Sequence, residues 1–271
     1  MRIRSCISVV LAASIASTAS AQDARLPRHD TLWIRGGDYQ LRVKTFRNPT
    51  LSSRPVLLVV LHGDAPFSKP DYHDVFASRV ASANADVVAA AILRPGYTDP
   101  EGHRSDGVRG HAVGDNYNAA NTRALAEVFA ALKARYSSRR VVVAAHSGGA
   151  TLAANILNHY PDVIDAAVLV ACSCDVSKWR AHMFVTTRHP LFRGTVETLS
   201  PIQSVERSSP KAEIVMFVGE KDNVTPPFLT TEYAAAATAA GKRVRVTIIP
   251  EKEHEIFFHP QVVAAVAELL K

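Results

Sequence analysis

Residues 139–152 read RRVVVAAHSGGATL, and this stretch decides which fold the chain can adopt. It opens with an apolar, β-branched run too short for a separate helix, and beyond Ser147 the apolar residues recur at helical spacing. The pattern predicts a strand that turns directly into a helix. So sharp a turn requires small neighbours, which Ala145, Gly148 and Gly149 supply. We therefore expect the Ser147 hydroxyl at the carboxyl end of a strand, beside the first free N–H groups of a helix.

The pentapeptide from Ala145 to Gly149 resembles the nucleophile elbow of the α/β-hydrolases, with alanine in place of the usual first glycine, as in some lipases of that fold. The resemblance implies that Ser147 is a nucleophile. The alternative is a buried serine at an ordinary strand–helix junction. Catalytic partners elsewhere in the chain have to distinguish the two.

Two later loops carry residues that match such partners. Residues 219–226, with the pattern Gly-x-x-Asp-x-x-x-Pro, are similar to the α/β-hydrolase loop that holds the triad acid, which implies Asp222. The family places its general base in the loop before the last helix, which implies His254. Ser147, Asp222 and His254 follow the family's chain order, each after a predicted parallel strand. The carboxyl ends of parallel strands share one edge of a sheet, where sites form.

Three other residues could take these roles. Glu220 is the near alternative to Asp222, although it lies very close to the end of its strand. Asp175 could serve as the acid or could cap the helix that follows it. His259 is the fallback for the general base.

A second strand end supplies the expected oxyanion site. The apolar run 55–61 predicts a strand buried on both faces, and His62-Gly63-Asp64 follows it. In the resembling family a backbone N–H just beyond such a His-Gly pair stabilises the oxyanion, which implies the amide of Asp64 beside that of Gly148. The role of Asp64 would then lie in its amide and not in its carboxylate. His62 is expected to be a structural histidine that fixes this loop.

The remaining pattern completes an α/β architecture. Strands are expected at 31–34, 39–46, 86–93, 164–171, 212–218 and 244–249, the first two as a hairpin at the sheet edge. Helices are expected at 72–83, 118–136, 231–240 and 260–270. Together these elements predict a mostly parallel, twisted sheet of about eight strands with helices on both faces, the α/β-hydrolase fold.

Residues 173–210 interrupt the regular pattern and predict a short cap insertion of one or two helices. Ser200-Pro201 suits a helix start, with the serine as its cap. Trp179, Phe184 and Phe192 either pack on the core or line an acyl or alkyl pocket, and we take them as candidate substrate-binding residues.

The polar segment 94–116 leaves the same strand edge as the elbow, so we expect it at the rim of the site. His103, Asp106, His111 and Asp115 within it suggest a metal site. Their spacing matches no metal signature well, and we favour a solvated loop.

The first 21 residues predict a secretory signal peptide. Arg2 and Arg4 precede the apolar run 6–16, and Ala19-Ser20-Ala21 precedes the expected cleavage before Gln22. The run is too short for a stable membrane anchor. We therefore expect one domain, residues 22–271, exported to a periplasm or to the medium.

Export and cleavage would remove Cys6 and leave two thiols in an oxidising compartment. Cys172 and Cys174 are separated by one residue, and the sequence leaves open whether they form a disulfide or remain unpaired. This pair alone does not indicate a metal site. The formal net charge of +6 falls to +4 without Arg2 and Arg4, and the absence of a run of five basic residues argues against nucleic acid as a partner.

These features predict an exported serine hydrolase, a carboxylesterase that cleaves small or medium esters through an acyl-serine intermediate. No metal or organic cofactor is required, and the expected partner is a small-molecule ester. The chain also has some similarity to dienelactone hydrolase and prolyl oligopeptidase relatives. Residues 200–202, Ser-Pro-Ile, resemble a stretch near the acid loop of the latter, which makes a serine peptidase the alternative.

Two considerations bear on the alternatives. Too little sequence precedes the core to form the gating domain of those peptidases. A third interpretation, a catalytically silent binding module on the same fold, conflicts with the presence of the serine, the acid and the histidine. The sequence gives no indication of an oligomeric state.

Overall fold

A computed structural model describes residues 28–110, 114 and 116–271 of the chain. The predicted signal peptide, residues 1–21, lies outside the described residues, as do His111 and Asp115.

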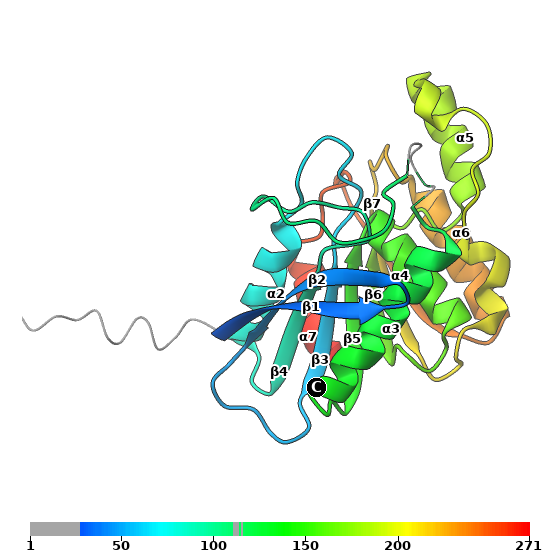
Figure 1. Ribbon diagram of the computed structural model, residues 1–271. Coiled ribbons are helices and arrows are strands. Elements are labelled where there is room, and N and C mark those ends of the chain that lie inside the picture. The colour runs from blue at the N-terminus through cyan, green and yellow to red at the C-terminus, as the bar shows by residue number, and fades with distance from the viewer. Residues whose placement is uncertain (1–27, 111–113, 115) are drawn as a thin grey trace, which may run out of the picture.

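An eight-stranded sheet in the order β1-β2-β4-β3-β5-β6-β7-β8 forms the centre of the protein (Figure 1). The strands β3 to β8 run parallel to one another, whereas β1 and β2 form an antiparallel hairpin at one edge, with β2 also antiparallel to β4. The prediction of a mostly parallel α/β-hydrolase sheet is confirmed. Its strands are β1 Arg28–Gly36, β2 Tyr39–Arg47, β3 Val56–Leu61, β4 Val87–Ile92, β5 Arg140–His146, β6 Ala166–Val170, β7 Glu213–Gly219 and β8 Arg243–Ile249.

Helices cover both faces of the sheet. The described helices are α2 Tyr72–Ala83, α3 Ala119–Arg135, α4 Gly148–His159, α5 Val176–Thr187, α6 Pro227–Ala239 and α7 Pro260–Leu269, with short 3₁₀ helices η1 Pro190–Phe192 and η2 Pro201–Arg207. Alternate residues of each strand point to opposite faces. In β3, Leu57, Val59 and Leu61 therefore pack toward α3, α4 and α6, and the residues between them pack toward α2 and α7. Coverage on both faces explains why every residue of β3 is buried.

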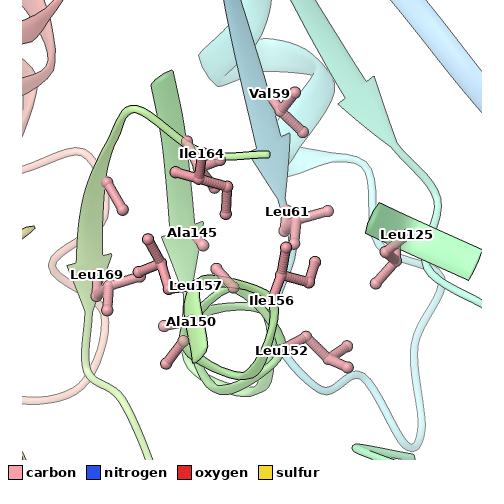
Figure 2. Close-up of a cluster of buried hydrophobic side chains, with 14 of the residues drawn as sticks. Val59, Leu61, Leu125, Ala145, Ala150, Leu152, Ile156, Leu157, Ile164 and Leu169 are labelled. Atoms are coloured by element: carbon pink, nitrogen blue, oxygen red, sulfur yellow. The ribbon is translucent and has the colours of Figure 1, made fainter. Parts of the chain in front are cut away.

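The helix that follows the elbow is anchored by its apolar face. Leu61, Ala145 and Leu169, from three neighbouring strands, lie over α4 (Figure 2). Leu152 and Ile156 of α4 are fully buried in the same cluster. This packing fixes the start of α4 against the sheet and so fixes the position of Ser147 immediately before it.

The predicted cap insertion contains α5, η1 and η2. In Figure 1, α5 extends away from the body of the domain near the carboxyl end of β7. Asp175 caps α5, because its carboxylate accepts a hydrogen bond from the Lys178 amide at 3.0 Å. The helix expected at Ser200 begins at Pro201, but the Ser200 hydroxyl does not cap it. Instead it accepts the Val176 amide at 3.0 Å, which ties η2 to the start of α5.

Cys172 and Cys174 form a disulfide, the first of the two alternatives left open by the sequence. Both residues are fully buried at the carboxyl end of β6. Within the described part of the chain, none of the helices combines the length and the apolar character that crossing a bilayer requires.

Candidate active site

The turn at Ser147 has the tight geometry expected of a nucleophile elbow. Ser147 adopts φ 53° and ψ −123°, in the left-handed region that non-glycine residues rarely occupy. The two glycines after it allow a close approach to the end of β3. A Cβ on Gly149 would lie 2.4 Å from the His62 carbonyl oxygen, and one on Gly148 would lie 2.3 Å from an Asp64 carboxylate oxygen. Larger residues at either position would therefore push the elbow away from the 62–64 loop.

The structure brings the three predicted triad side chains together from three different loops. The Ser147 hydroxyl lies 3.1 Å from His254 Nε2. The His254 Nδ1 lies 2.9 Å from Asp222 Oδ2, which can accept its hydrogen. Asp222 follows β7, and His254 lies between β8 and α7. The result is one hydrogen-bonded row from a carboxylate through an imidazole to a hydroxyl.

Asp222 is held as an ionised acceptor. Its Oδ1 accepts the amides of Val224 and Thr225, at 2.9 and 2.8 Å, and its Oδ2 also accepts the Thr225 hydroxyl at 2.8 Å. Burial by itself would raise the pKa of Asp222, but the hydrogen bond and charge of His254 and the bonds from Thr225 outweigh it and lower that pKa. Thr225 was not singled out from the sequence, although its place three residues after Asp222 is typical of such local side-chain bonds.

The alternative triad residues have other partners. Glu220 accepts the amide of Glu251 at 2.9 Å. The His259 ring accepts the Gln261 amide at 3.4 Å and caps α7. Asp175 caps α5, as described above. The geometry therefore favours Asp222 and His254 over all three.

The expected oxyanion amides lie on facing segments. Asp64 follows β3, and Gly148 opens α4 next to Ser147. Within the described part of the chain, neither amide donates a hydrogen bond to a protein group. They therefore remain the candidate donors to an oxyanion formed at Ser147.

The carboxylate of Asp64 has a structural role that the sequence did not reveal. It accepts hydrogen bonds from Arg94 at 2.9 Å, from Tyr97 at 3.2 Å and from Tyr117. Arg94 is fully buried and also donates to the His62 carbonyl at 3.1 Å. Its positive charge offsets a carboxylate that would otherwise repel an oxyanion nearby. Arg94 and Tyr97, from the loop after β4, therefore help to hold the 62–64 segment in place.

His62 is the structural histidine that the sequence predicts. It is fully buried, its Nε2 accepts the Arg94 amide at 3.0 Å, and its Nδ1 lies 2.7 Å from the Gly63 carbonyl oxygen. These contacts fix the loop that carries Asp64.

The described residues of the 94–116 loop do not favour a metal. Asp106 accepts the Gln40 amide at 2.8 Å. His103 lies near Asp99 and Glu101, and these carboxylates could hold a cation with it. However, Arg42 pairs with both acids and Lys44 pairs with Glu101. The negative charge is thus already balanced by the protein.

A cavity of about 670 Å³ opens over Ser147 and His254. Its apolar wall contains Met183 and Leu191 together with Trp179 and Phe192, two of the predicted substrate-binding residues. The Trp179 indole N–H donates to the Val224 carbonyl at 2.7 Å, which joins the cap helix to the acid loop.

Phe184, the third predicted substrate-binding residue, does not line this cavity. It faces a separate hollow of about 330 Å³ between α5 and residues 192–198. Trp179 and Met183 are four residues apart and share one helical face, whereas position 184 is turned about 100° from position 183. The rotation of α5 about its own axis decides which of these side chains face the cavity, and the sequence did not define that rotation.

Three buried histidines near the site predict acid sensitivity of the fold. Burial lowers the pKa of His73 and His146 to about 3 and that of His62 well below its usual value. The unfolded chain takes up protons below about pH 6.5, whereas the folded chain does not. The free energy of unfolding should therefore decrease as the pH falls from about 6.5 toward 3, by up to about 1.4 kcal/mol per pH unit for each histidine.

Urea unfolding at neutral and mildly acidic pH measures this dependence. His73→Gln removes one of the three groups and should flatten the pH dependence relative to the wild type. Equal stability of the wild type at both pH values would contradict the prediction.

The sheet, the elbow and the Ser–His–Asp row define an α/β-hydrolase-fold serine hydrolase. Residues 111–271 match the prolyl oligopeptidase family, peptidase family S9, and the chain belongs to that family. Comparison with curated proteins found no matching sequence.

Solved structures with the same fold include both peptidases and esterases. The Pyrococcus horikoshii acylaminoacyl peptidase is 11% identical with a TM-score of 0.69, over 93% of this chain and 42% of its own. A Mycobacterium tuberculosis puromycin-hydrolyzing peptidase is 15% identical with a TM-score of 0.71, over 95% of this chain and 40% of its own. A Pyrococcus furiosus esterase is 16% identical with a TM-score of 0.68, over 97% of both chains. The chain thus spans about two-fifths of the peptidases that it matches.

Proposed function

We propose that the protein is a carboxylesterase that cleaves small or medium esters through an acyl-serine intermediate. The observation that carries the proposal is the row Asp222–His254–Ser147, with contacts of 2.9 and 3.1 Å. A serine hydroxyl is a weak nucleophile until a base accepts its proton, and His254 Nε2 is positioned to do so. Asp222 would hold His254 in the tautomer with hydrogen on Nδ1 and stabilise the imidazolium that forms.

The reaction would proceed in two halves. Ser147 Oγ attacks the ester carbonyl, and the amides of Gly148 and Asp64 receive the negative charge of the tetrahedral intermediate. The C–O bond to the alcohol breaks, and the proton held by His254 passes to the departing alcohol. Water then attacks the acyl-serine while His254 accepts a proton from it. The bond from the acyl carbon to Ser147 Oγ breaks, His254 returns the proton to Oγ, and the acid is released.

The wall of the cavity supports an apolar acyl or alkyl group as the bound part of the substrate. Trp179, Met183, Leu191 and Phe192 present apolar surface beside Ser147. A mostly apolar cavity with a few polar groups at its base is the usual form of a small-molecule site.

A serine peptidase is the second candidate, and membership of the prolyl oligopeptidase family favours it. The esterase interpretation is favoured by the P. furiosus esterase, which is similar over 97% of both chains. At 16% identity that likeness concerns the fold.

A matched pair of substrates tests the proposal. The p-nitrophenyl ester and the p-nitroanilide of one short acyl group differ only in the bond to be cleaved, and an aminoacyl anilide adds a free amine. We expect hydrolysis of the ester and no measurable hydrolysis of either anilide. Cleavage of an anilide at a rate comparable to that of the ester would establish the peptidase instead.

We also propose export after cleavage before Gln22. The charged and apolar pattern of residues 1–21 supports this, and so does the disulfide between Cys172 and Cys174, since such bonds persist in oxidising compartments. The mass of the protein recovered from a bacterial periplasm or culture medium would give its N-terminus. Recovery only from the cytoplasm, with Met1 retained, would contradict the proposal.

A further inference from the structure

His146, the residue before Ser147, is a buried histidine to which the mechanism above gives no role. It is 2% exposed, and its ring lies 5.0 Å from that of His254 and 5.5 Å from that of Phe257. Its two nitrogens each have a partner. Nδ1 lies 3.0 Å from the Tyr72 hydroxyl, and Nε2 lies 3.3 Å from the His254 backbone carbonyl oxygen.

These partners fix the direction of every hydrogen bond. The His254 carbonyl can only accept, so Nε2 of His146 carries the hydrogen. Nδ1 of the neutral ring is then an acceptor, and the Tyr72 hydroxyl must donate to it. The Tyr72 oxygen in turn accepts the Gly63 amide. These bonds form one hydrogen-bond chain: the Gly63 N–H donates to the Tyr72 hydroxyl, the Tyr72 hydroxyl donates to His146, and His146 donates to the His254 carbonyl.

This hydrogen-bond chain touches three of the segments that the proposed reaction needs. Gly63 immediately precedes Asp64, whose amide is an expected oxyanion donor. His146 immediately precedes the nucleophile, and the His254 carbonyl belongs to the general base itself. Tyr72 is the first residue of α2, so the hydrogen-bond chain also connects these segments to a helix packed on the sheet.

We propose that Tyr72 and His146 are a pair of positioning residues that hold the oxyanion amide and the general base in register with Ser147. The inference rests on the proposed hydrolase function. Neither side chain exchanges a proton with the substrate in this role. They set the geometry of groups that act only when negative charge develops, so the pair should affect the transition state more than substrate binding.

Tyr72→Phe removes both hydrogen bonds of the hydroxyl and keeps the ring contacts with His146 and Phe257. We expect kcat for a p-nitrophenyl ester to fall by about 10- to 100-fold with little change in KM, because small displacements of reacting groups cost about that much. Inhibition by a boronic acid, which forms a tetrahedral adduct on serine, should weaken in parallel with kcat.

Tyr233→Phe is the matched control. Tyr233 is also fully buried and loses one hydrogen bond, to Asn158 Oδ1 at 3.4 Å, in the helical layer formed by α4 and α6. It should retain the kcat of the wild type, whatever its effect on thermal stability. A kcat for Tyr72→Phe equal to that of Tyr233→Phe would overturn the inference.

Position 146 provides a second test. His146→Gln keeps an acceptor and a donor on one planar group, whereas His146→Leu keeps neither. Glutamine should therefore retain more of kcat than leucine. The kcat of the double variant Tyr72→Phe, His146→Leu should be no lower than that of His146→Leu alone, because His146→Leu already removes the hydrogen bond that Tyr72 donates. Equal activities of the two 146 variants, or additive losses in the double variant, would contradict a shared chain.

Fluorophosphonate labelling in the same experiment separates the two proposals. Labelling of the wild type, absent in Ser147→Ala, together with an unchanged kcat in Tyr72→Phe, would overturn only the positioning role. A wild type that neither labels nor hydrolyses esters would overturn the proposed function and the inference with it.

Discussion

Ser147→Ala is expected to abolish ester hydrolysis, with kcat reduced by about 10⁵-fold or more, as when other serine hydrolases lose their nucleophile. The Ser147 hydroxyl supplies the attacking oxygen, and its 3.1 Å contact with His254 Nε2 provides the route for its proton. The variant removes both. Alanine keeps the Cβ and the backbone, so the elbow should fold as before. Measurements of kcat with a p-nitrophenyl ester, and of covalent labelling by a fluorophosphonate, should both reach background.

Ser173→Ala is the matched control for this variant. Ser173 is a buried serine near the same edge of the sheet, and its hydroxyl lies 2.7 Å from that of Thr151. It should keep full labelling. Activity of Ser147→Ala as high as that of Ser173→Ala would show that another group is the nucleophile, and the assignment of the elbow would fail.

The elbow and the succession of strands and helices along the chain could be predicted because their signals are local. A short β-branched run, a serine between small residues and helical spacing beyond it lie within one stretch of sequence. The helix 72–83 was predicted with the bounds that the structure shows, because turn-forming residues flank it at both ends. Asp222 and His254 could be predicted because their loops resemble the α/β-hydrolase loops that carry the acid and the base, and each loop follows a predicted strand.

Other parts of the site depend on contacts between distant segments. Arg94 lies in a polar loop without periodicity, and its ion pair with Asp64 joins residues thirty positions apart. The sequence predicted Tyr72 only as the first residue of a helix. Its contact with His146, seventy-four positions later, forms only when the chain folds. The cavity that Phe184 faces depends on the rotation of α5 about its axis. The apolar residues of this segment are spaced too irregularly to predict that rotation. The sequence thus predicted the three side chains of the Ser–His–Asp row better than the residues that hold them.

Asp222→Asn is expected to lower kcat by about 10⁴-fold while leaving the fold intact, because it forces the wrong tautomer of His254. Oδ1 of Asp222 accepts two backbone amides, so the amide oxygen of an asparagine must take that place. Its NH₂ group then faces His254 Nδ1, which has to become an acceptor. The imidazole hydrogen moves to Nε2, and Nε2 can no longer accept the proton of Ser147.

Asp175→Asn is the matched control, since asparagine caps helices about as well as aspartate and Asp175 serves α5 as a cap. It should retain wild-type kcat, and circular dichroism should show both variants folded. The tautomer argument also predicts that KM of Asp222→Asn changes little, because the cavity beside Trp179 is not altered. If Asp222→Asn kept its activity while Glu220→Gln lost it, the acid would be Glu220, and His254 would have to turn toward a residue that now accepts the amide of Glu251.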